Sequence, residues 1–294
     1  MKIGFIGAGK VGTAFGVYLK SRGFEISGYC SRSPASSSKA AELTASRHFT
    51  DAAVLSSESD IVFITTPDGD IKDVCDLLAL KKALRKGQII AHMSGALSSE
   101  VLKSAQDDGC WVYSLHPIQS FVSLENALKS LPGTFFSIEG DTEKNSQLEE
   151  LIAEAGNRCF RIAPNDKVLY HAAACVFSNF LVALMDEGLQ YLNRIGINEQ
   201  EGFSAMLPLI MGTISNIELH GTNNALTGPI ARGDSDTIVN QMENIELYLP
   251  QSLEFYRTMS RKTLQVAMKN KLAAEDKSAS LESITNIINT WRLT

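Results

Sequence analysis

The clearest chemical pattern stands at the start of the chain, where a glycine-rich segment follows a short apolar run. The segment comprises Gly7, Ala8, Gly9, Lys10, Val11 and Gly12. In such a turn the first glycine allows a tight bend, the second lets a diphosphate approach the backbone, and the third lets the next helix pack closely. Free N–H groups at the start of that helix would hold the diphosphate. The segment therefore predicts a dinucleotide site.

The end of the second apolar run indicates which dinucleotide would bind. A site selective for NAD places Asp or Glu there, to accept a hydrogen bond from the ribose 2′-hydroxyl. Here the run is followed by Ser31, Arg32 and Ser33, with no acid. A guanidinium and two hydroxyls suit a 2′-phosphate, which a carboxylate would repel. The sequence therefore favours NADP (NADPH) as cofactor, and the alternative is a solvated turn with a surface arginine.

Further polar residues stand where later strands would end. Ligands of open α/β sheets bind beyond the carboxyl ends of the strands. The candidates for cofactor or substrate contact there are Thr66, Pro67, Ser94, Gly95 and His116. His92 also ends an apolar run, and for both histidines the alternative is a turn residue bonded to the backbone. No metal site is predicted, because the histidines lack the short spacings typical of zinc ligands.

A long helical pattern covers residues 165–195, and residues 168–185 are apolar on nearly every side. We therefore expect this part of the helix to be deeply buried. His171 and Asn179 lie on one stripe of it, together with Cys175 and Ser178. Polar groups in a buried helix need partners, which a ligand, a neighbouring helix or water would supply.

The segment 221–234 reads as a loop and carries one more candidate. The guanidinium of Arg232 is suited to clamp a substrate carboxylate, and the alternative is a surface ion pair. Asp234 is predicted to cap the helix that follows.

These residues must be positioned by alternating strands and helices in the first part of the chain. Short apolar runs occupy 2–6, 24–30, 60–65, 88–92, 110–115, 134–139 and 158–163. Runs of this length and composition are typical of a parallel sheet covered on both faces. The intervening helices are expected to be capped by Asp51, Asp68, Ser98 and Asp141.

After Pro164 only helical patterns remain, at 165–195, 198–219, 235–248, 250–268 and 279–292. The predicted fold class is thus α/β, with a doubly wound, mostly parallel Rossmann sheet followed by an all-helical C-terminal domain. We expect an NADP-binding domain at 1–164 and a helical substrate or dimerisation domain at 165–294.

The composition argues against several other classes of protein. The net charge of −6 argues against nucleic acid or an anionic membrane as the main partner. Five scattered cysteines with no CxxC pair favour neither a disulfide framework nor a thiolate zinc site. The first strand begins at Lys2, which leaves no room for a signal peptide, and we find no continuous apolar run of about 18 residues. We expect a cytoplasmic protein.

Together these segments resemble Rossmann-like proteins that carry a C-terminal helical DUF2520 domain, near ketopantoate reductase and pyrroline-5-carboxylate reductase in the 6-phosphogluconate dehydrogenase superfamily. The resemblance covers essentially the whole chain and rests on GFIGAGKVG, HMSGALSSE, HPIQSF, YHAAACVFSNFLVAL and ALTGPIARGD. It implies an NADPH-dependent reductase of a small 2-oxo acid, with ketopantoate as the best single substrate, and it implies a homodimer.

One departure from these relatives affects the chemistry. Ketopantoate reductase and hydroxyisobutyrate dehydrogenase carry a catalytic lysine on the long helix, followed after eight residues by an asparagine. The matching positions here are His171 and Asn179, so the lysine is replaced. Histidine can donate a proton near neutral pH, which makes His171 the candidate acid and His116 its rival. Asn179 and Ser94 would then orient the substrate, and Arg232 would anchor its carboxylate.

Two alternatives follow from the same residues. The first is an imine reductase resembling pyrroline-5-carboxylate reductase. The second is an NADPH-binding sensor without catalysis, which the missing lysine favours.

Overall fold

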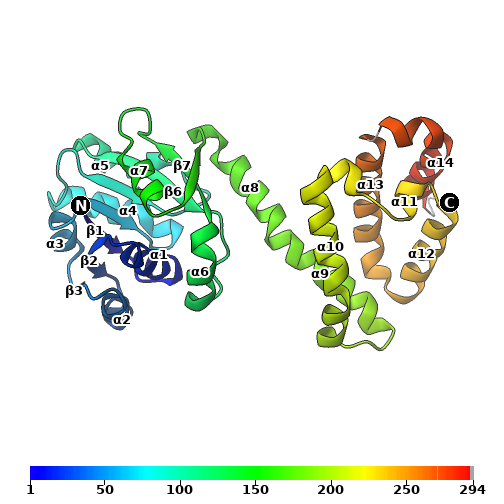
Figure 1. Cartoon of the computed structure of the whole chain (residues 1–294), viewed down its shortest axis with the longest axis horizontal. Helices are drawn as coiled ribbons and strands as arrows, with labels where there is room; N and C mark the ends of the chain where they lie inside the picture. The colour runs from blue at the N-terminus through cyan, green and yellow to red at the C-terminus, as the bar shows by residue number, and fades with distance from the viewer. Residues whose placement is uncertain (270, 292–294) are drawn as a thin grey trace. The chain divides into compact units, whose positions relative to one another are not determined.

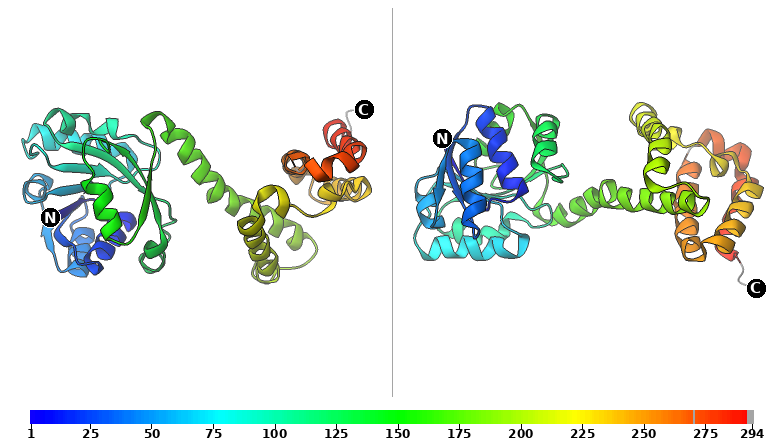
Figure 2. Two further views of the ribbon diagram at one scale, coloured as in Figure 1. Left: turned by 45° about the horizontal axis from the view of Figure 1, so that its top comes forward. Right: turned by 90° about the horizontal axis from the view of Figure 1, so that it is seen from below.

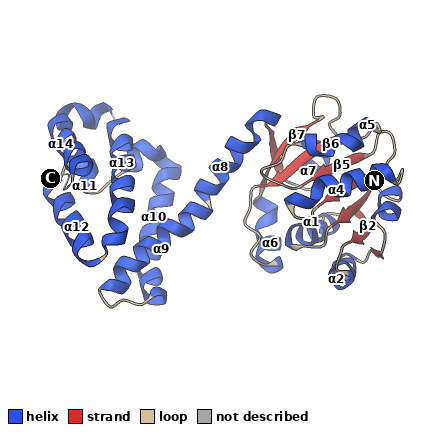
Figure 3. Ribbon diagram, turned by 180° about the vertical axis from the view of Figure 1, so that it is seen from behind, coloured by secondary structure: helices blue, strands red, loops and turns tan. Residues whose placement is uncertain are grey.

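The computed structural model describes residues 1–269 and 271–291, without the side chains of 271–278. The chain divides into two compact units, Met1–Phe180 and Leu181–Thr294. All strands among the described residues belong to the first unit, and the second is helical (Figure 3). The expected division into functional domains at residue 164 stays a prediction, because it concerns what each part does.

The first unit is built on one eight-stranded sheet with the order β3-β2-β1-β4-β5-β6-β7-β8. The strands are β1 (Lys2–Ile6), β2 (Glu25–Cys30), β3 (Arg47–Phe49), β4 (Ile61–Ile64), β5 (Ile89–His92), β6 (Trp111–Pro117), β7 (Phe135–Gly140) and β8 (Arg158–Arg161). Neighbouring strands are parallel except for the antiparallel pair β6–β7. The order reverses direction at β1, so the predicted doubly wound, mostly parallel sheet is confirmed.

Helices cover both faces of this sheet (Figures 1 and 2). One apolar core joins the sheet to α1 (Lys10–Ser21), α2 (Pro34–Thr44), α6 (Leu124–Ser130) and α7 (Gln147–Glu154). A second core, on the other face, includes α3 (Ala52–Ser57), α4 (Asp68–Leu80) and α5 (Lys103–Asp107). Short 3₁₀ turns η1 (Ser99–Leu102), η2 (Leu131–Gly133) and η3 (Pro164–Asp166) complete the connections. Both faces are covered at the centre of the sheet, which explains why the central strands β4 and β5 are buried throughout and, except for His92, apolar.

The sequence analysis missed the short edge strand β3, whose three residues include one buried side chain, Phe49. Of the predicted caps, Asp51 does cap α3 by accepting from the N–H of Ala53. The prediction for Asp68 is wrong: it is the first residue of α4, and its carboxylate accepts instead from the Ser94 hydroxyl. Asp141 likewise accepts from the N–H of Val112 rather than capping a helix.

The expected single helix at 165–195 forms two helices, α8 (Lys167–Phe177) and α9 (Asn179–Arg194), separated at Ser178. Deep burial of residues 168–185 is also wrong for the single chain. Large apolar side chains exposed in this stretch are Val168, Leu169, Val176, Phe177, Phe180, Leu181, Val182 and Leu184. An apolar composition indicates that a surface needs cover, and the single chain does not supply that cover.

The second unit contains α10 (Glu199–Ala225), α11 (Pro229–Arg232), α12 (Ser235–Tyr248), η4 (Pro250–Ser252), α13 (Leu253–Lys269) and α14 (Lys271–Thr290). Its core includes Ile230, Ile238, Met242, Leu264, Ile284 and Ile288. As predicted, Asp234 caps α12, where its carboxylate accepts from the N–H of Thr237.

Two helical segments, Pro164–Arg194 and Glu199–Ala225, are long and apolar enough to cross a membrane by length and composition alone. No such span was expected from the sequence, because neither segment is an uninterrupted apolar run, whereas an average over 18 residues tolerates polar positions. The same composition is found in helices that pack against protein.

Candidate functional site

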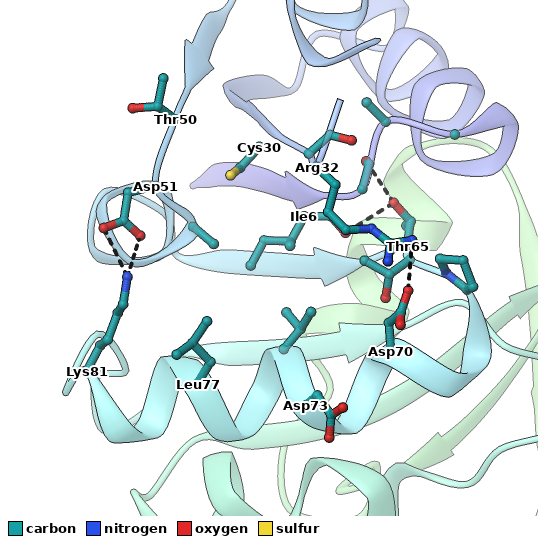
Figure 4. A pocket seen from close by; sticks show the side chains of 18 residues that line it. Ile6, Cys30, Arg32, Thr50, Asp51, Thr65, Asp70, Asp73, Leu77 and Lys81 are labelled. Atoms are coloured by element: carbon teal, nitrogen blue, oxygen red, sulfur yellow. Dashed lines mark hydrogen bonds and ion pairs between the residues drawn. The ribbon is translucent and has the colours of Figure 1, made fainter. Parts of the chain in front are cut away.

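A pocket with a volume of about 670 Å³ opens beyond the carboxyl ends of β1, β2 and β4 (Figure 4). Its walls include the glycine-rich turn after β1, the segment after β2 and one side of α4. The lining residues that the sequence analysis singled out are Gly7, Ala8, Gly9, Arg32, Ser31, Thr66 and Pro67. Of the residues expected to hold a dinucleotide, these seven line one pocket, whereas Lys10, Val11, Gly12 and Ser33 are not among its lining residues.

The glycine-rich turn packs tightly against the segment that connects β4 to α4. Gly7 has φ +114°, and a Cβ there would lie 2.6 Å from the backbone of Thr65. A Cβ on Gly12 would lie 2.3 Å from the hydroxyl of Thr65. Gly9 differs, because a Cβ built on it has nothing within 4 Å. The fold therefore needs glycine at the first and third positions, whereas Gly9 leaves space free for a ligand.

Two further features of the pocket fit a dinucleotide. No side chain caps the N-terminus of α1, so its first N–H groups are available to an anion. The hydroxyl of Thr66 is buried and lacks a hydrogen-bond partner among the described residues. A ligand with phosphate and ribose oxygens would satisfy both sets of groups.

The segment after β2 is organised around the start of α2. Ser31 accepts from the N–H of Ser33, and the Ser33 hydroxyl accepts from the N–H of Ser36 as the cap of α2. The Arg32 side chain is 81% exposed and lies 3.1 Å from the carboxylate of Asp70. The guanidinium is therefore accessible at the pocket, where it forms an ion pair with Asp70.

A second polar region lies at the ends of β5 and β6. The Ser94 hydroxyl donates to Asp68 at 2.7 Å and accepts from the N–H groups of Ala96 and Leu97. His92 is fully buried, with Nδ1 facing the N–H of Ser94 and Nε2 facing the carbonyl of Ser98. Burial lowers the pKa of His92 to about 4. The structure therefore favours the alternative stated for His92, a residue bonded to the backbone of the neighbouring turn.

The structure brings His116 and His171 together across Gly95. A Cβ built on Gly95 would lie 2.9 Å from Nε2 of His116 and 2.6 Å from Nδ1 of His171. The two ring centroids are 6.1 Å apart. Tyr170 places its hydroxyl 2.7 Å from Nδ1 of His116. The predicted site residues Gly95, His116 and His171 thus lie together, although they come from distant parts of the sequence. Only glycine at position 95 leaves room for both rings.

Lys167 is the most unusual residue of this region, and the sequence analysis missed it. It is 1% exposed, and its amine donates to the Ser94 carbonyl at 3.1 Å and to the Ser114 hydroxyl at 2.7 Å. These bonds tie α8 to the ends of β5 and β6. The signal was present, because a lysine four residues before His171 lies on the same helix face.

Burial of Lys167 predicts a pH-dependent stability. Burial lowers the pKa of Lys167 from 10.5 to about 8. Between these values the unfolded chain holds a proton that the folded chain has released, so rising pH favours the folded state. From about pH 7 to about pH 10, we expect the wild type to gain about 2 kcal/mol of unfolding free energy relative to Lys167→Met. Urea unfolding followed by fluorescence of Trp111 measures this difference, and a constant difference would contradict it.

Asn179 is exposed at the start of α9, beyond the interruption at Ser178. Arg232 belongs to the second unit, is 64% exposed and lies 3.9 Å from Asp234. Their roles in substrate binding stay predictions. Among the described residues, no group of three His, Cys, Asp or Glu side chains is arranged to hold a metal ion.

Two family models match separate parts of the chain, and the second match begins within the first unit. A Rossmann-like domain matches residues 1–117, and a domain of unknown function, DUF2520, matches residues 134–263. No curated protein matches the chain.

Several solved structures share the fold over nearly the whole chain. Protein TM1727 from Thermotoga maritima is 28% identical, with a TM-score of 0.70, and the match covers 92% of this chain and 99% of that one. A putative NADP oxidoreductase, BF3122 from Bacteroides fragilis, is 22% identical over 89% of this chain and 97% of that one, with a TM-score of 0.71. An imine reductase from Pseudomonas sp. is 17% identical over 95% and 99%, with a TM-score of 0.66. The chain therefore joins an N-terminal Rossmann-like domain to a C-terminal DUF2520 domain.

Proposed function

We propose that this protein is an NADPH-dependent oxidoreductase that reduces the C=O or C=N bond of a small carboxylate. The observation that carries the proposal is the placement of two polar sites along one edge of the sheet. The glycine-rich pocket lies at the ends of β1, β2 and β4, and the histidine pair lies near the ends of the adjacent strands β5 and β6. The hydrogen bond between Asp68 and Ser94 joins the two sites.

The choice of NADPH over NADH rests on the segment after β2. Arg32 is accessible at the pocket and the segment carries no acid of its own, which suits a 2′-phosphate. Solved structures of this fold include a reductive aminase from Aspergillus terreus with NADPH and a pyrroline carboxylate reductase from Plasmodium falciparum with NADP.

Arg32→Ala should weaken NADPH binding and leave NADH binding almost unchanged. Loss of a charge-assisted contact costs about 1.5–3 kcal/mol, which corresponds to about 10- to 100-fold in affinity. Calorimetric titration with both nucleotides measures the ratio. Arg22→Ala, on the exposed end of α1 away from the pocket, is the matched control. A variant that loses both nucleotides equally would contradict the assignment of Arg32.

The proposed reaction needs little from the protein beyond position and a proton. Bound NADPH would supply a hydride to the substrate carbon. His171 or His116 would protonate the oxygen or nitrogen, Ser94 and Asn179 would orient the group, and Arg232 would anchor the carboxylate. Ketopantoate, a 2-oxo acid, is the best single substrate on the resemblance noted in the sequence.

The proposal is tested by incubating the protein and NADPH with ketopantoate and, separately, with pyrroline-5-carboxylate. Loss of reduced-nicotinamide absorbance with ketopantoate supports a 2-oxo acid reductase. Loss only with the imine supports the imine reductase, and solved structures of this fold include an imine reductase and a pyrroline-5-carboxylate reductase. Tight NADPH binding without oxidation across a panel of 2-oxo acids and imines would refute the enzyme and leave the sensor.

We also propose a homodimer in the cytoplasm, with neither nucleic acid nor membrane as partner. The exposed apolar side chains of α8 and α9 support the dimer, because so large an apolar surface is rarely left in water. Light scattering tests it: a monomer at micromolar concentration would refute the dimer.

A further inference from the structure

Tyr170 contacts His116 at Nδ1, whereas Gly95 lies near Nε2 and Cε1 of the same ring. Its hydroxyl lies 2.7 Å from Nδ1 of His116, and the two rings meet edge to face with centroids 5.7 Å apart. Burial raises the pKa of Tyr170, so the hydroxyl keeps its proton near neutral pH. The amine of Lys167 lies 5.7 Å from the centre of the Tyr170 ring, and a cation there draws electrons from the phenol. Both effects favour the hydroxyl as the donor and Nδ1 as the acceptor.

A neutral imidazole that accepts at Nδ1 carries its hydrogen on Nε2. Nε2 of His116 and Nδ1 of His171 both lie close to Gly95. That nitrogen of His171 is buried and lacks a hydrogen-bond partner among the described residues. Gly95 is therefore flanked by one N–H donor and by one buried nitrogen that lacks a partner among the described residues, and a polar ligand atom that reached them would satisfy both.

We propose that Tyr170 is a positioning residue that fixes the Nε2–H form of His116, and that His116 rather than His171 protonates the reduced substrate. This inference rests on the proposed function. As the Nε2–H bond breaks and a bond from hydrogen to the substrate oxygen or nitrogen forms, Nδ1 takes the hydroxyl proton of Tyr170. The imidazole stays neutral, the phenolate remains on Tyr170 beside the cation of Lys167, and water returns the proton.

The proton transfer from Tyr170 to His116 is needed because His116 alone would be a poor proton donor. Burial, together with the charges of Lys167 and His171, lowers the pKa of His116 to about 4, against an opposite influence of Asp68. The imidazolium form is therefore scarce at neutral pH. A neutral imidazole is a very weak acid unless its second nitrogen receives a proton at the same time. Tyr170 supplies that proton.

The test compares wild type, Tyr170→Phe and Tyr113→Phe. Tyr113 is a matched control, because its buried hydroxyl on the same strand as His116 donates to the Asn145 carbonyl. Nitrogen NMR of the full chain without nucleotide reads the tautomer, with the His116 signals assigned through His116→Gln. We expect Nε2–H in wild type and Tyr113→Phe, and a mixture of tautomers in Tyr170→Phe.

Turnover gives the second readout. Tyr170→Phe should lower kcat by about 100-fold, with KM and NADPH affinity unchanged, while Tyr113→Phe keeps wild-type kcat. A hydrogen on Nδ1 in wild type, or the same tautomer and turnover in Tyr170→Phe, would overturn the role of Tyr170. Because the tautomer is read without nucleotide, a wild type that fails to oxidise NADPH would refute the proposed function while the NMR result still decides whether Tyr170 sets the tautomer.

Discussion

Gly9→Ala is expected to fold normally and to bind NADPH about 10- to 100-fold more weakly than wild type. A Cβ at this position has nothing within 4 Å, so the methyl group costs the folded chain little. The same methyl group would stand where the diphosphate must approach the start of α1, and forcing extra volume into a filled contact costs about 1–3 kcal/mol. Calorimetric titration with NADPH measures the loss, and circular dichroism checks the fold.

Two other glycines sharpen this prediction. Gly133→Ala is the matched control, because a Cβ there also meets open space and the position lies in η2, outside the pocket. Gly12→Ala should instead reduce stability, because its Cβ would lie 2.3 Å from the Thr65 hydroxyl. If Gly9→Ala bound NADPH as tightly as Gly133→Ala, the diphosphate would not lie against this turn.

The second large effect concerns the histidine pair. His116→Ala should lower kcat by about 100- to 10,000-fold, because it removes the group that we assign as proton donor. NADPH affinity should change little, since His116 is not among the residues that line the glycine-rich pocket. His171→Ala should lower kcat less, because His171 lies beside Gly95 without the hydrogen bond that Tyr170 makes to His116.

Steady-state kinetics with the best substrate from the panel, together with NADPH titrations, distinguishes these effects. His48→Ala serves as control, because His48 is exposed on the edge strand β3 and is not among the residues that line the glycine-rich pocket. A larger loss in His171→Ala than in His116→Ala would reverse the assignment. Unchanged turnover in both variants would remove the pair from the mechanism.

The order of elements was predictable because each signal is local. The short apolar runs at 2–6 and 60–65 match β1 and β4 within one residue, since strands buried on both faces must be continuously apolar. The edge strand β3 was not predictable, because its pairing with β2 depends on the sheet rather than on its own three residues. The burial of 168–185 failed for a related reason: composition shows that a helix needs cover but not which chain provides it.

The site was predictable in part. Gly7, Arg32 and His116 were found because strand ends and a glycine pattern mark them in the sequence. The meeting of His116 with His171 over Gly95 depends on the path of α8, which no local signal describes. Lys167 and Tyr170 looked like ordinary helix residues, and their importance appears only in the hydrogen bonds that they make across the fold.

A crystal structure of the protein with NADP⁺ tests the central claim most directly. The account predicts that the diphosphate lies against the backbone N–H groups at the start of α1, beside Gly9, with the 2′-phosphate within hydrogen-bond distance of Arg32. A nucleotide bound elsewhere, or a pocket that stays empty at saturating NADP⁺, would contradict the claim and the reductase proposed from it.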